Sequence, residues 1–361
     1  MDVPATGDRR SRRLSELRGE DEARFGGKSA RLGELLRAGI PVPAGFALPT
    51  EAFSEFMLQS GLRDRLTGML AAVTPDLDSV GAASHAISEM MRSVSVPESV
   101  RQDLSQGYRE LGELAGTASP PVAVRSSALG EDGQEATFAG QQETYLWVRG
   151  IEHVLDAVRD CWLSLYSAPA ISYRSRLGLA QEDAAMGVAI QLMVDAEVSG
   201  VMFTCNPVSG DPSMVAINAS WGLGLAVVGG EVTPDDYLLS KVTREVVREH
   251  VTSKRVEYVP DAGGRGAVRR QVPQERRDSR CLDRAALDAL ADVARRIERY
   301  FGSHQDIEWG LARGSSPPGS LFVLQSRPVT ALPKQDPRPP PASALELVMG
   351  TFGADRKPSE R

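Results

Sequence analysis

Residues 120–148 read PPVAVRSSALGEDGQEATFAGQQETYLWV. A short apolar run ends at Arg125 and two serines, a polar segment with three glycines follows, and an apolar run then resumes. An arginine at a strand end keeps its charge and can fork onto two phosphate oxygens. Ser126, Ser127 and Thr137 add hydroxyl donors, and the glycines allow the segment to close over a ligand. The stretch predicts either a phosphate clamp with its lid or a solvated loop with a surface ion pair.

Composition excludes several classes of protein. The chain has 361 residues, 42% of them hydrophobic, which is enough for one large or two medium domains. Its net charge of −7 gives no basic field that would indicate nucleic acid. No apolar run approaches the roughly 18 residues of a membrane span. Three widely separated cysteines, Cys161, Cys205 and Cys281, fit neither a disulfide framework nor a metal knuckle. We therefore expect a cytoplasmic protein without nucleic-acid or membrane partners.

The order of elements along the chain predicts an α+β protein. Residues 1–20 are arginine-rich and lack the apolar segment of an export signal, so they are expected to form a flexible arm. Two apolar runs at 186–194 and 200–204 suggest a hairpin, and the Arg- and Gly-rich range 262–281 suggests a solvated excursion. Residues 333–361 are Pro-rich and linker-like. Helices and strands alternate irregularly, which favours α+β layers over a Rossmann sheet.

The segment FGGKSARLG contains Gly27, Lys28 and Ser29, the last part of a phosphate-binding loop. The glycine that such a loop needs six residues before its lysine is replaced by Glu22, which excludes that motif. A lysine at a helix N-terminus, after two glycines, can still approach an anion. An exposed lysine at a glycine turn explains the same residues.

The sequences QDIEW and LQSRP are the sharpest local signal. Asp306 and Glu308 are two residues apart, so both carboxylates face one side of a strand. Gln325 and Arg327 have the same spacing on the expected partner strand. Two carboxylates, an amide oxygen and an arginine on adjoining strands suit Mg²⁺ that bridges phosphates. A cross-strand salt bridge on a solvated sheet face is the structural alternative.

Other reactive side chains are assigned no chemistry. The chain has only four histidines, none with an evident base or metal partner, so no catalytic histidine is assigned. Cys205 is interpreted as a buried thiol at a strand end. The WGLG sequence at 221–224 predicts either a close approach of the backbone to a ligand or a tight turn.

Taken together, these fragments resemble a known family. GGKSARLGELLRAGIPVPAGF, AVRSSALGEDGQEATFAGQQETYL, GVMFTCNP, WGLG, DIEW and LQSRP occur in family order between positions 26 and 330. They closely resemble the N-terminal ATP-binding domain of the phosphoenolpyruvate synthase and pyruvate, phosphate dikinase family, which is shared with rifampicin phosphotransferases. The resemblance implies an ATP-grasp-like fold in which two subdomains clasp ATP. The expected bounds are 21–185 for the subdomain with the lid and 186–332 for the subdomain with the metal-binding strands.

The same resemblance implies roles for individual residues. It implies nucleotide contacts for nine positions: Lys28, Arg125, Thr137, Gly140, Thr144, Gln191, Glu308, Gln325 and Arg327. Glu308 and Gln325 match the family's Mg²⁺ ligands, with Asp306 nearby. Arg125 and Arg327 would stabilise charge during catalysis.

Full-length members of that family continue into a swivelling domain with a phosphorylatable histidine. This chain ends at Arg361 without one, so we expect a split system with the histidine supplied in trans, or a fragment. The implied activity is an ATP-dependent, dikinase-type phosphotransfer: the β-phosphoryl of Mg-ATP passes, as pyrophosphoryl, to that histidine and AMP is released. Alternatives are a phenylphosphate synthase-like or antibiotic phosphotransferase-like system, and an ATP-grasp ligase that forms an acyl phosphate and ADP. A nucleotide sensor without turnover would not need Glu308, Gln325 and Arg327.

Overall fold

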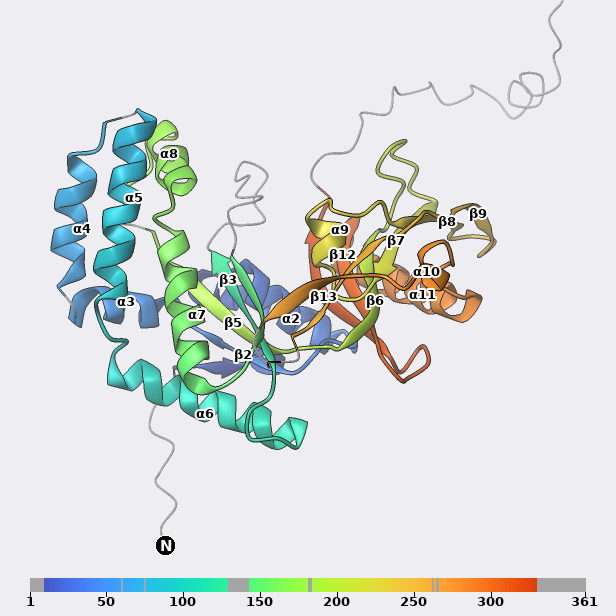
Figure 1. Cartoon of the computed structure of the whole chain (residues 1–361), viewed down its shortest axis with the longest axis horizontal. Helices are drawn as coiled ribbons and strands as arrows, with labels where there is room; N and C mark the ends of the chain where they lie inside the picture. The colour runs from blue at the N-terminus through green and yellow to red at the C-terminus, as the bar shows by residue number, and fades with distance from the viewer. Residues whose placement is uncertain are drawn as a thin grey trace, which may run out of the picture.

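The computed structural model describes residues 10–59, 61–74, 76–128, 143–180, 184–261, 263 and 266–329. Two lobes, each built on an antiparallel sheet with helices packed against it, lie side by side (Figure 1). The strand order is β1-β2-β5-β3-β4 in the first sheet and β13-β12-β6-β7-β8-β9 in the second, and β10 and β11 form a separate hairpin. The prediction of an α+β protein is confirmed.

The first lobe wraps helices around one sheet. Its strands are β1 (Arg12–Arg13), β2 (Gly45–Leu48), β3 (Val122–Ala128), β4 (Thr144–Val148) and β5 (Met186–Leu192). Its helices include α3 (Thr50–Gln59), α4 (Leu62–Ala71), α5 (Leu77–Arg92), α6 (Glu98–Ala115), α7 (Ile151–Ser164) and α8 (Ala168–Arg176). The indole of Trp162 lies against Phe53 and Phe56, with ring centroids 5.9 and 5.2 Å away. Strand β3 is buried along its whole length.

The second lobe has one covered and one open sheet face. Its strands are β6 (Ala196–Phe203), β7 (Met214–Trp221), β8 (Asp235–Ser240), β9 (Val246–His250), β12 (Gln305–Ala312) and β13 (Leu321–Pro328). Helix α11 (Arg284–Phe301) is capped by Asp283, whose carboxylate accepts from Ala286 N, and ends at Gly302. Alternate residues of β12, Ile307 and Trp309, share a buried core with that helix. The intervening positions of β12 therefore face the other side.

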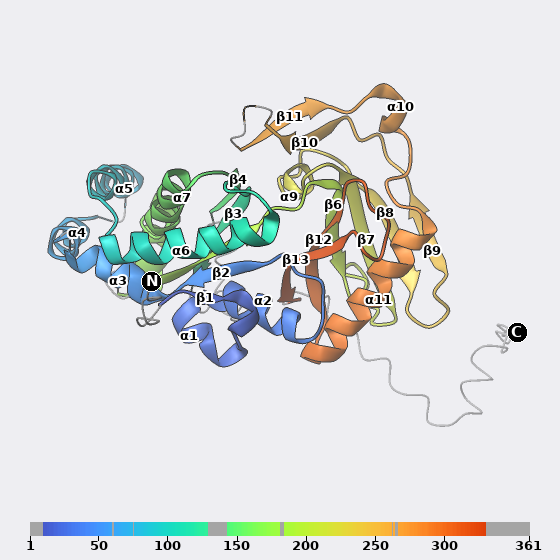
Figure 2. The ribbon, with the colours of Figure 1, turned by 90° about the horizontal axis from the view of Figure 1, so that it is seen from below.

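Smaller elements surround these sheets. They are the short α9 (Leu225–Val228), β10 (Val256–Pro260), β11 (Ala267–Gln271) and α10 (Gln274–Arg277) in the second lobe, and η1 (Leu14–Glu16), η2 (Gly19–Asp21), α1 (Glu22–Phe25) and α2 (Gly27–Arg37) near the N-terminus. Figure 2 shows α2 between the two lobes, where Leu32 and Leu35 join the core of the second sheet. Arg31 Nη2 donates to Gln305 Oε1 at 3.0 Å, so α2 also contacts the start of β12.

The expected flexible arm is wrong for its described part, residues 10–20. Leu14 and Leu17 are fully buried, and β1 pairs with β2. Arg10, Arg12 and Arg13, which suggested a solvated arm, form ion pairs instead, such as Arg13 with Glu110 at 3.1 Å. Residues 1–9 and the Pro-rich tail 333–361 lie outside the described residues.

The predicted boundary at 185/186 and the predicted hairpin are also wrong. Strand β5 pairs with β2 and β3, so the first lobe extends through Leu192. Strand β6 begins at Ala196 in the other sheet, and the chain crosses between the lobes over residues 193–195. Two apolar runs separated by a short polar break fix the existence of two strands but not the partner of each.

The range 262–281 was expected to be a solvated excursion and is partly ordered into a hairpin arm. Strand β11 pairs with β10 along five residues and is largely exposed, while Val272 just beyond it is fully buried. No helix in the described part of the chain has both the length and the apolar composition needed to cross a membrane.

A buried carboxylate at the start of β8 holds the segment that leads into this hairpin arm. Asp235, at the start of β8, is fully buried and is paired with the equally buried ammonium of Lys254. It also accepts from Thr252 N and Cys281 N, both at 2.9 Å. These bonds tie β8 to the segments that precede β10 and α11. Because both charges are out of water, each depends on the other.

We predict that Lys254→Met lowers the free energy of unfolding by about 3–5 kcal/mol, because it leaves the Asp235 charge buried without its partner. The urea midpoint measures this loss. The matched control is Arg248→Met, which breaks the solvent-exposed pair with Asp236 on the next residue of β8 and should cost about 1 kcal/mol or less. Equal midpoints for the two variants would contradict the role of the buried pair.

Candidate functional site

A cavity lies between the two lobes, on the open face of the second sheet. Residues from β3, β4, β5, the crossing segment, β6, α9 and its preceding loop, β12 and β13 line it: Ala123, Arg125, Thr144, Leu146, Gln191, Leu192, Met193, Val194, Ala196, Ser199, Leu223, Gly224, Leu225, Val228, Glu308 and Leu324. Strand register places its polar groups toward one end, where Arg125 is opposite Thr144. The other end, beside the crossing segment, is mainly apolar.

Arg125 joins the lobes at the polar end of the cavity. Its Nη1 donates to Leu324 O at 2.7 Å and its Nη2 to Glu308 Oε2 at 3.0 Å, so one guanidinium from β3 holds two strands of the second sheet. The side chain is only 8% exposed. Its Nε is buried and has no hydrogen-bond partner among the described residues. A buried donor without a partner beside a cavity is suited to an anionic ligand.

Lys28 lies next to this arginine and is not an exposed lysine at a turn. Its Nζ donates to Ser126 O at 3.0 Å, and Ser29 N donates to Ser127 Oγ at 3.1 Å. The start of α2 is thus bonded to the end of β3, which carries Arg125. Gly26 permits this approach: its φ is 79°, and a Cβ there would lie 2.0 Å from Ser127 O.

Strands β12 and β13 pair as the sequence predicts. Glu308 is opposite Gln325, and Asp306 is opposite Arg327. Arg327 Nε and Nη2 each lie 2.8 Å from Asp306 Oδ2, so the cross-strand salt bridge considered as an alternative is present. Burial raises the pKa of the Asp306 carboxyl, and the charge of Arg327 opposes this shift. Glu308 instead pairs with Arg125. Glu308 lines the cavity, and Gln325 lies opposite it on β13.

Some of the remaining predicted site residues line the cavity and others do not. Thr144 lines the cavity opposite Arg125. Gln191 also lines it but is almost fully buried, and its Nε2 donates to Pro43 O at 3.3 Å. Thr137 and Gly140 lie outside the described residues. Four predicted residues do not line the cavity itself: Lys28, Asp306, Gln325 and Arg327. Gln325 is paired with Glu308, which does line it, and Lys28 bonds the residue after Arg125.

Sequence reasoning missed the apolar wall of the cavity. Met193 and Val194 belong to the apolar run that the sequence assigned to a hairpin strand. Leu223 and Gly224 belong to the WGLG sequence, and Leu225 belongs to no motif. Leu324 reaches the cavity because a β-bulge interrupts the pairing of β12 with β13 after Glu308. A bulge depends on the partner strand and leaves no pattern in a single segment.

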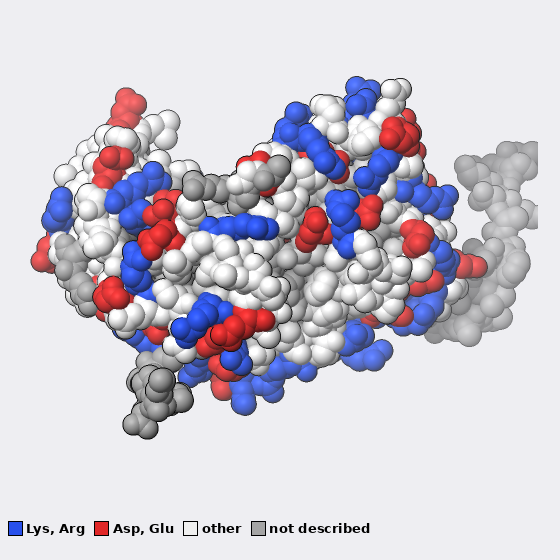
Figure 3. All heavy atoms as spheres, turned by 60° about the horizontal axis from the view of Figure 1, so that its bottom comes forward, with Lys and Arg blue, Asp and Glu red and all other residues white. Residues whose placement is uncertain are grey.

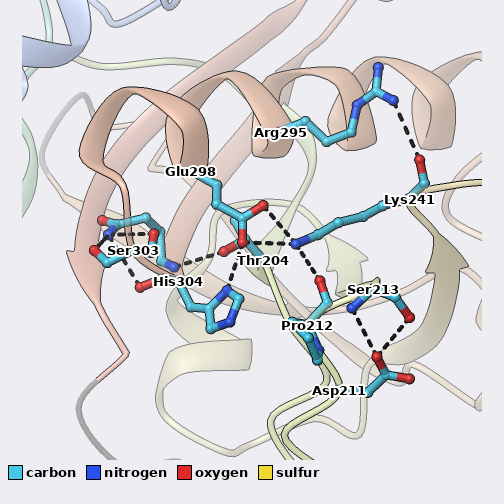
Figure 4. Close-up of polar contacts among 10 residues, drawn as sticks. Thr204, Asp211, Pro212, Ser213, Lys241, Arg295, Glu298, Ser303 and His304 are labelled. Atoms are coloured by element: carbon cyan, nitrogen blue, oxygen red, sulfur yellow. Dashed lines mark hydrogen bonds and ion pairs between the residues drawn. The ribbon is translucent and has the colours of Figure 1, made fainter. Parts of the chain in front are cut away.

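A cluster of polar side chains and backbone groups joins the start of β12 to α11 and to the segments after β6 and β8 (Figure 4). Lys241 Nζ bonds Glu298 Oε2 at 2.6 Å and Pro212 O at 2.7 Å, and His304 Nδ1 lies 2.6 Å from Glu298 Oε1. Gln305 N donates to Thr204 Oγ1 at 2.8 Å. His304 is thus engaged with α11, and none of the four histidines of the chain lines the cavity.

Figure 3 shows one face of the molecule, on which lysine and arginine side chains are interspersed with aspartate and glutamate. Charged side chains elsewhere in the described part of the chain are commonly paired, as Arg92 is with Asp160 at 2.9 Å and Arg101 with Glu152 at 2.6 Å. A face of this kind creates no extended field of one sign. The concentrated charge of the site comes instead from the few residues around Arg125.

Comparisons with known proteins identify the family of the chain. The family described as pyruvate phosphate dikinase, AMP/ATP-binding domain, matches residues 22–346, and the chain belongs to this family. A probable phosphoenolpyruvate synthase of Methanothermobacter thermautotrophicus is 41% identical over 320 residues, which cover 88% of this chain and 46% of the relative. A probable phosphoenolpyruvate synthase of Methanocaldococcus jannaschii is 38% identical over 322 residues, covering 89% and 27%. The phosphoenolpyruvate synthase of Aeropyrum pernix is 37% identical over 349 residues, covering 89% and 43%.

The family resemblance noted in the sequence is confirmed by these matches. The chain spans less than half the length of each of these three relatives. The shared part is the AMP/ATP-binding domain, and the described cavity lies within it.

We predict that Lys28→Ala and Arg125→Ala each weaken ATP binding about tenfold or more, because each removes a charged contact to phosphate worth about 1.5–3 kcal/mol. Isothermal titration calorimetry in the presence of Mg²⁺ measures the affinity. Arg24→Ala is the control, since this arginine is near Lys28 in sequence but pairs with Glu51 at the surface. Unchanged affinity in both site variants would refute the assignment of the polar end.

Proposed function

We propose that the two lobes clasp Mg-ATP in the cavity as an ATP-grasp-like unit and pass its β-phosphoryl, as pyrophosphoryl, to a histidine on another domain or subunit. The observation that carries this proposal is the position of Arg125, which comes from one sheet and contacts a predicted metal ligand, Glu308, on the other. The match to the AMP/ATP-binding domain family supports the choice of nucleotide.

The difference between the two ends of the cavity supports one orientation of the nucleotide. The base would occupy the apolar end beside Val194, Leu223 and Leu225, where burial of an aromatic ring is favourable. The phosphates would extend toward Arg125 and Lys28. Thr144 lines the same end and could bond a phosphate oxygen. Thr137 and Gly140 belong to this proposal as parts of a lid.

The residues at the polar end fit a magnesium ion. Glu308 and Gln325 offer a carboxylate and an amide oxygen from adjacent strands, with Asp306 two residues away on β12. No three acidic, histidine or cysteine side chains within the described ranges form a metal cage of their own. Mg²⁺ commonly binds to one or two protein oxygens together with nucleotide phosphates, so this partial set is of the right kind. Bound there, the ion would supply positive charge to the phosphate oxygens.

The nucleophile has to come from outside the cavity lining, which contains no histidine. An imidazole nitrogen would attack the β-phosphorus, and the bond from that phosphorus to the α,β-bridging oxygen would break. The bridging oxygen leaves with AMP, and the histidine retains the pyrophosphoryl group. Arg327 is half-exposed at the edge strand β13 and is oriented by Asp306. It would stabilise charge on the transferred phosphates, while this chain contributes positioning and electrostatics.

The names of the relatives favour pyruvate as the final acceptor, reached through the histidine-bearing domain. We propose that this domain acts in trans or as a further part of the same protein. On this proposal the described chain carries the nucleotide half-reaction.

We predict that the chain alone turns over ATP negligibly, because water replaces an oriented imidazole poorly. With a purified histidine-bearing domain of a phosphoenolpyruvate synthase relative and β-labelled ATP, AMP should form and the label should appear on the histidine. Chromatography of the nucleotides and phosphohistidine analysis read both outcomes. Formation of ADP with a carboxylic acid, and no need for a histidine partner, would favour an acyl phosphate-forming ligase instead.

Two substitutions test the roles of the metal-facing strands in that assay. Glu308→Gln keeps the shape but removes one negative charge, and should reduce labelling by orders of magnitude. Arg327→Lys should lose most of the labelling because a point charge cannot reproduce the guanidinium fork. Arg313→Lys is the control, since Arg313 lies at the surface near Asp195. Near-normal labelling with Glu308→Gln would mean that β12 and β13 form only a structural salt-bridge face.

A further inference from the structure

A third apolar cluster, much smaller than the cores of the two lobes, lies behind the apolar end of the cavity. Its buried members are Trp147, Val194, Ala196 and Leu223, and partly buried residues packed against them include Met193, Tyr258, Ala267 and Leu324. Trp147 is its contribution from the first sheet, and the others come from the crossing segment and the second lobe. Val194, Ala196, Leu223 and Leu324 also line the cavity, so this hinge cluster forms the back of its wall.

A β-bulge directs Trp147 into the hinge cluster. Val122 pairs with Val148 and Val124 with Tyr145, so Leu146 and Trp147 together oppose the single residue between those partners. Tyr145 and Val148 pack against the core of the first lobe, whereas Leu146 lines the cavity. Regular alternation would place Trp147 on the same face as Tyr145, away from the cavity. The bulge reverses that direction, as bulges beside functional sites commonly do.

The backbone at this bulge is unusual for a bulky residue. Trp147 has a φ of 58°, in the left-handed region that residues other than glycine rarely adopt. Such a conformation is strained and persists only where its surroundings enforce it. Contacts around Trp147 must therefore hold its backbone in this conformation.

The β10–β11 hairpin supplies them from the second lobe. Gly266 N donates to Trp147 O at 3.1 Å, and Asp261 N donates to Gly266 O at 3.0 Å across the hairpin. Tyr258 and Ala267, one from each hairpin strand, pack in the hinge cluster. Leu223 N donates to Tyr258 O at 2.8 Å, which ties the hairpin to the cavity wall. Figure 2 shows the hairpin reaching past α9 toward β4.

We propose that Trp147 is a positioning residue for the nucleotide base: it sets the spacing of the lobes at the apolar end of the cavity without lining the cavity itself. The polar end has its own tie in Arg125, and a bound phosphate can compete for that guanidinium. The hinge cluster is held by packing of apolar side chains and of Tyr258, whose hydroxyl donates to Glu231. It therefore keeps its contacts while the polar end rearranges, and it acts through Val194 and Leu223. This inference rests on the proposed nucleotide site.

The test compares two buried indoles by calorimetry with Mg-ATP. Trp147→Leu should weaken ATP binding about 3- to 30-fold, the range expected for a residue that acts on a site through its neighbours. Trp162→Leu removes a comparable indole from the core of the first lobe, where it lies against Phe53 and Phe56, and should leave ATP affinity unchanged. Trp147→Phe should recover most of the affinity. Circular dichroism verifies that every variant is folded at the titration temperature.

A second variant covers the case in which Trp147→Leu does not fold. Tyr258→Ser disturbs the hinge cluster from β10, outside both lobe cores, and should also weaken ATP binding several-fold. Unchanged ATP affinity in Trp147→Leu, or in Tyr258→Ser where the former is unfolded, would overturn the inference. Equal weakening by Trp147→Leu and Trp162→Leu would overturn it too, since the effect would then be general destabilisation. Failure of the wild-type chain to bind ATP would overturn the proposed function itself.

Discussion

The contact of Arg125 with Glu308 and with the carbonyl of Leu324 determines how the two sheets face each other. A buried guanidinium is stable only where acceptors replace the water it has lost. Among the described residues, both hydrogen-bond acceptors of this guanidinium come from the second lobe. The second lobe supplies a carboxylate and a carbonyl. The charge of one residue thereby holds the cavity between two separate sheets.

The open face of the second sheet also follows from which of its side chains are buried. One face is covered by α11, whose apolar side takes Ile307 and Trp309 of β12. Alternation along β12 then leaves Asp306 and Glu308 on the uncovered face. Carboxylates on that face are stable because each has an arginine partner, and an anionic ligand with a cation can replace those partners. On the proposed function, the salt-bridge face and the nucleotide site would be two states of one arrangement.

Local periodicity predicted the parts of the site that depend on a single strand or helix. The pairing of β12 with β13 and the shared face of Asp306 and Glu308 follow from spacing alone. Features that depend on distant partners were not predictable. Strand β5 joined the first sheet, and Leu14 and Leu17 became buried beneath residues far along the chain. The bulges at Trp147 and Leu324 likewise arise from the opposing strand.

A crystal structure of the chain with Mn²⁺ and a non-hydrolysable ATP analogue tests the central claim most directly. The account predicts an anomalous peak for the metal between Glu308 and Gln325, phosphates against Arg125 and Lys28, and the base against Val194 and Leu223. A nucleotide bound outside the cavity between the lobes, or a metal peak remote from Glu308, would contradict it.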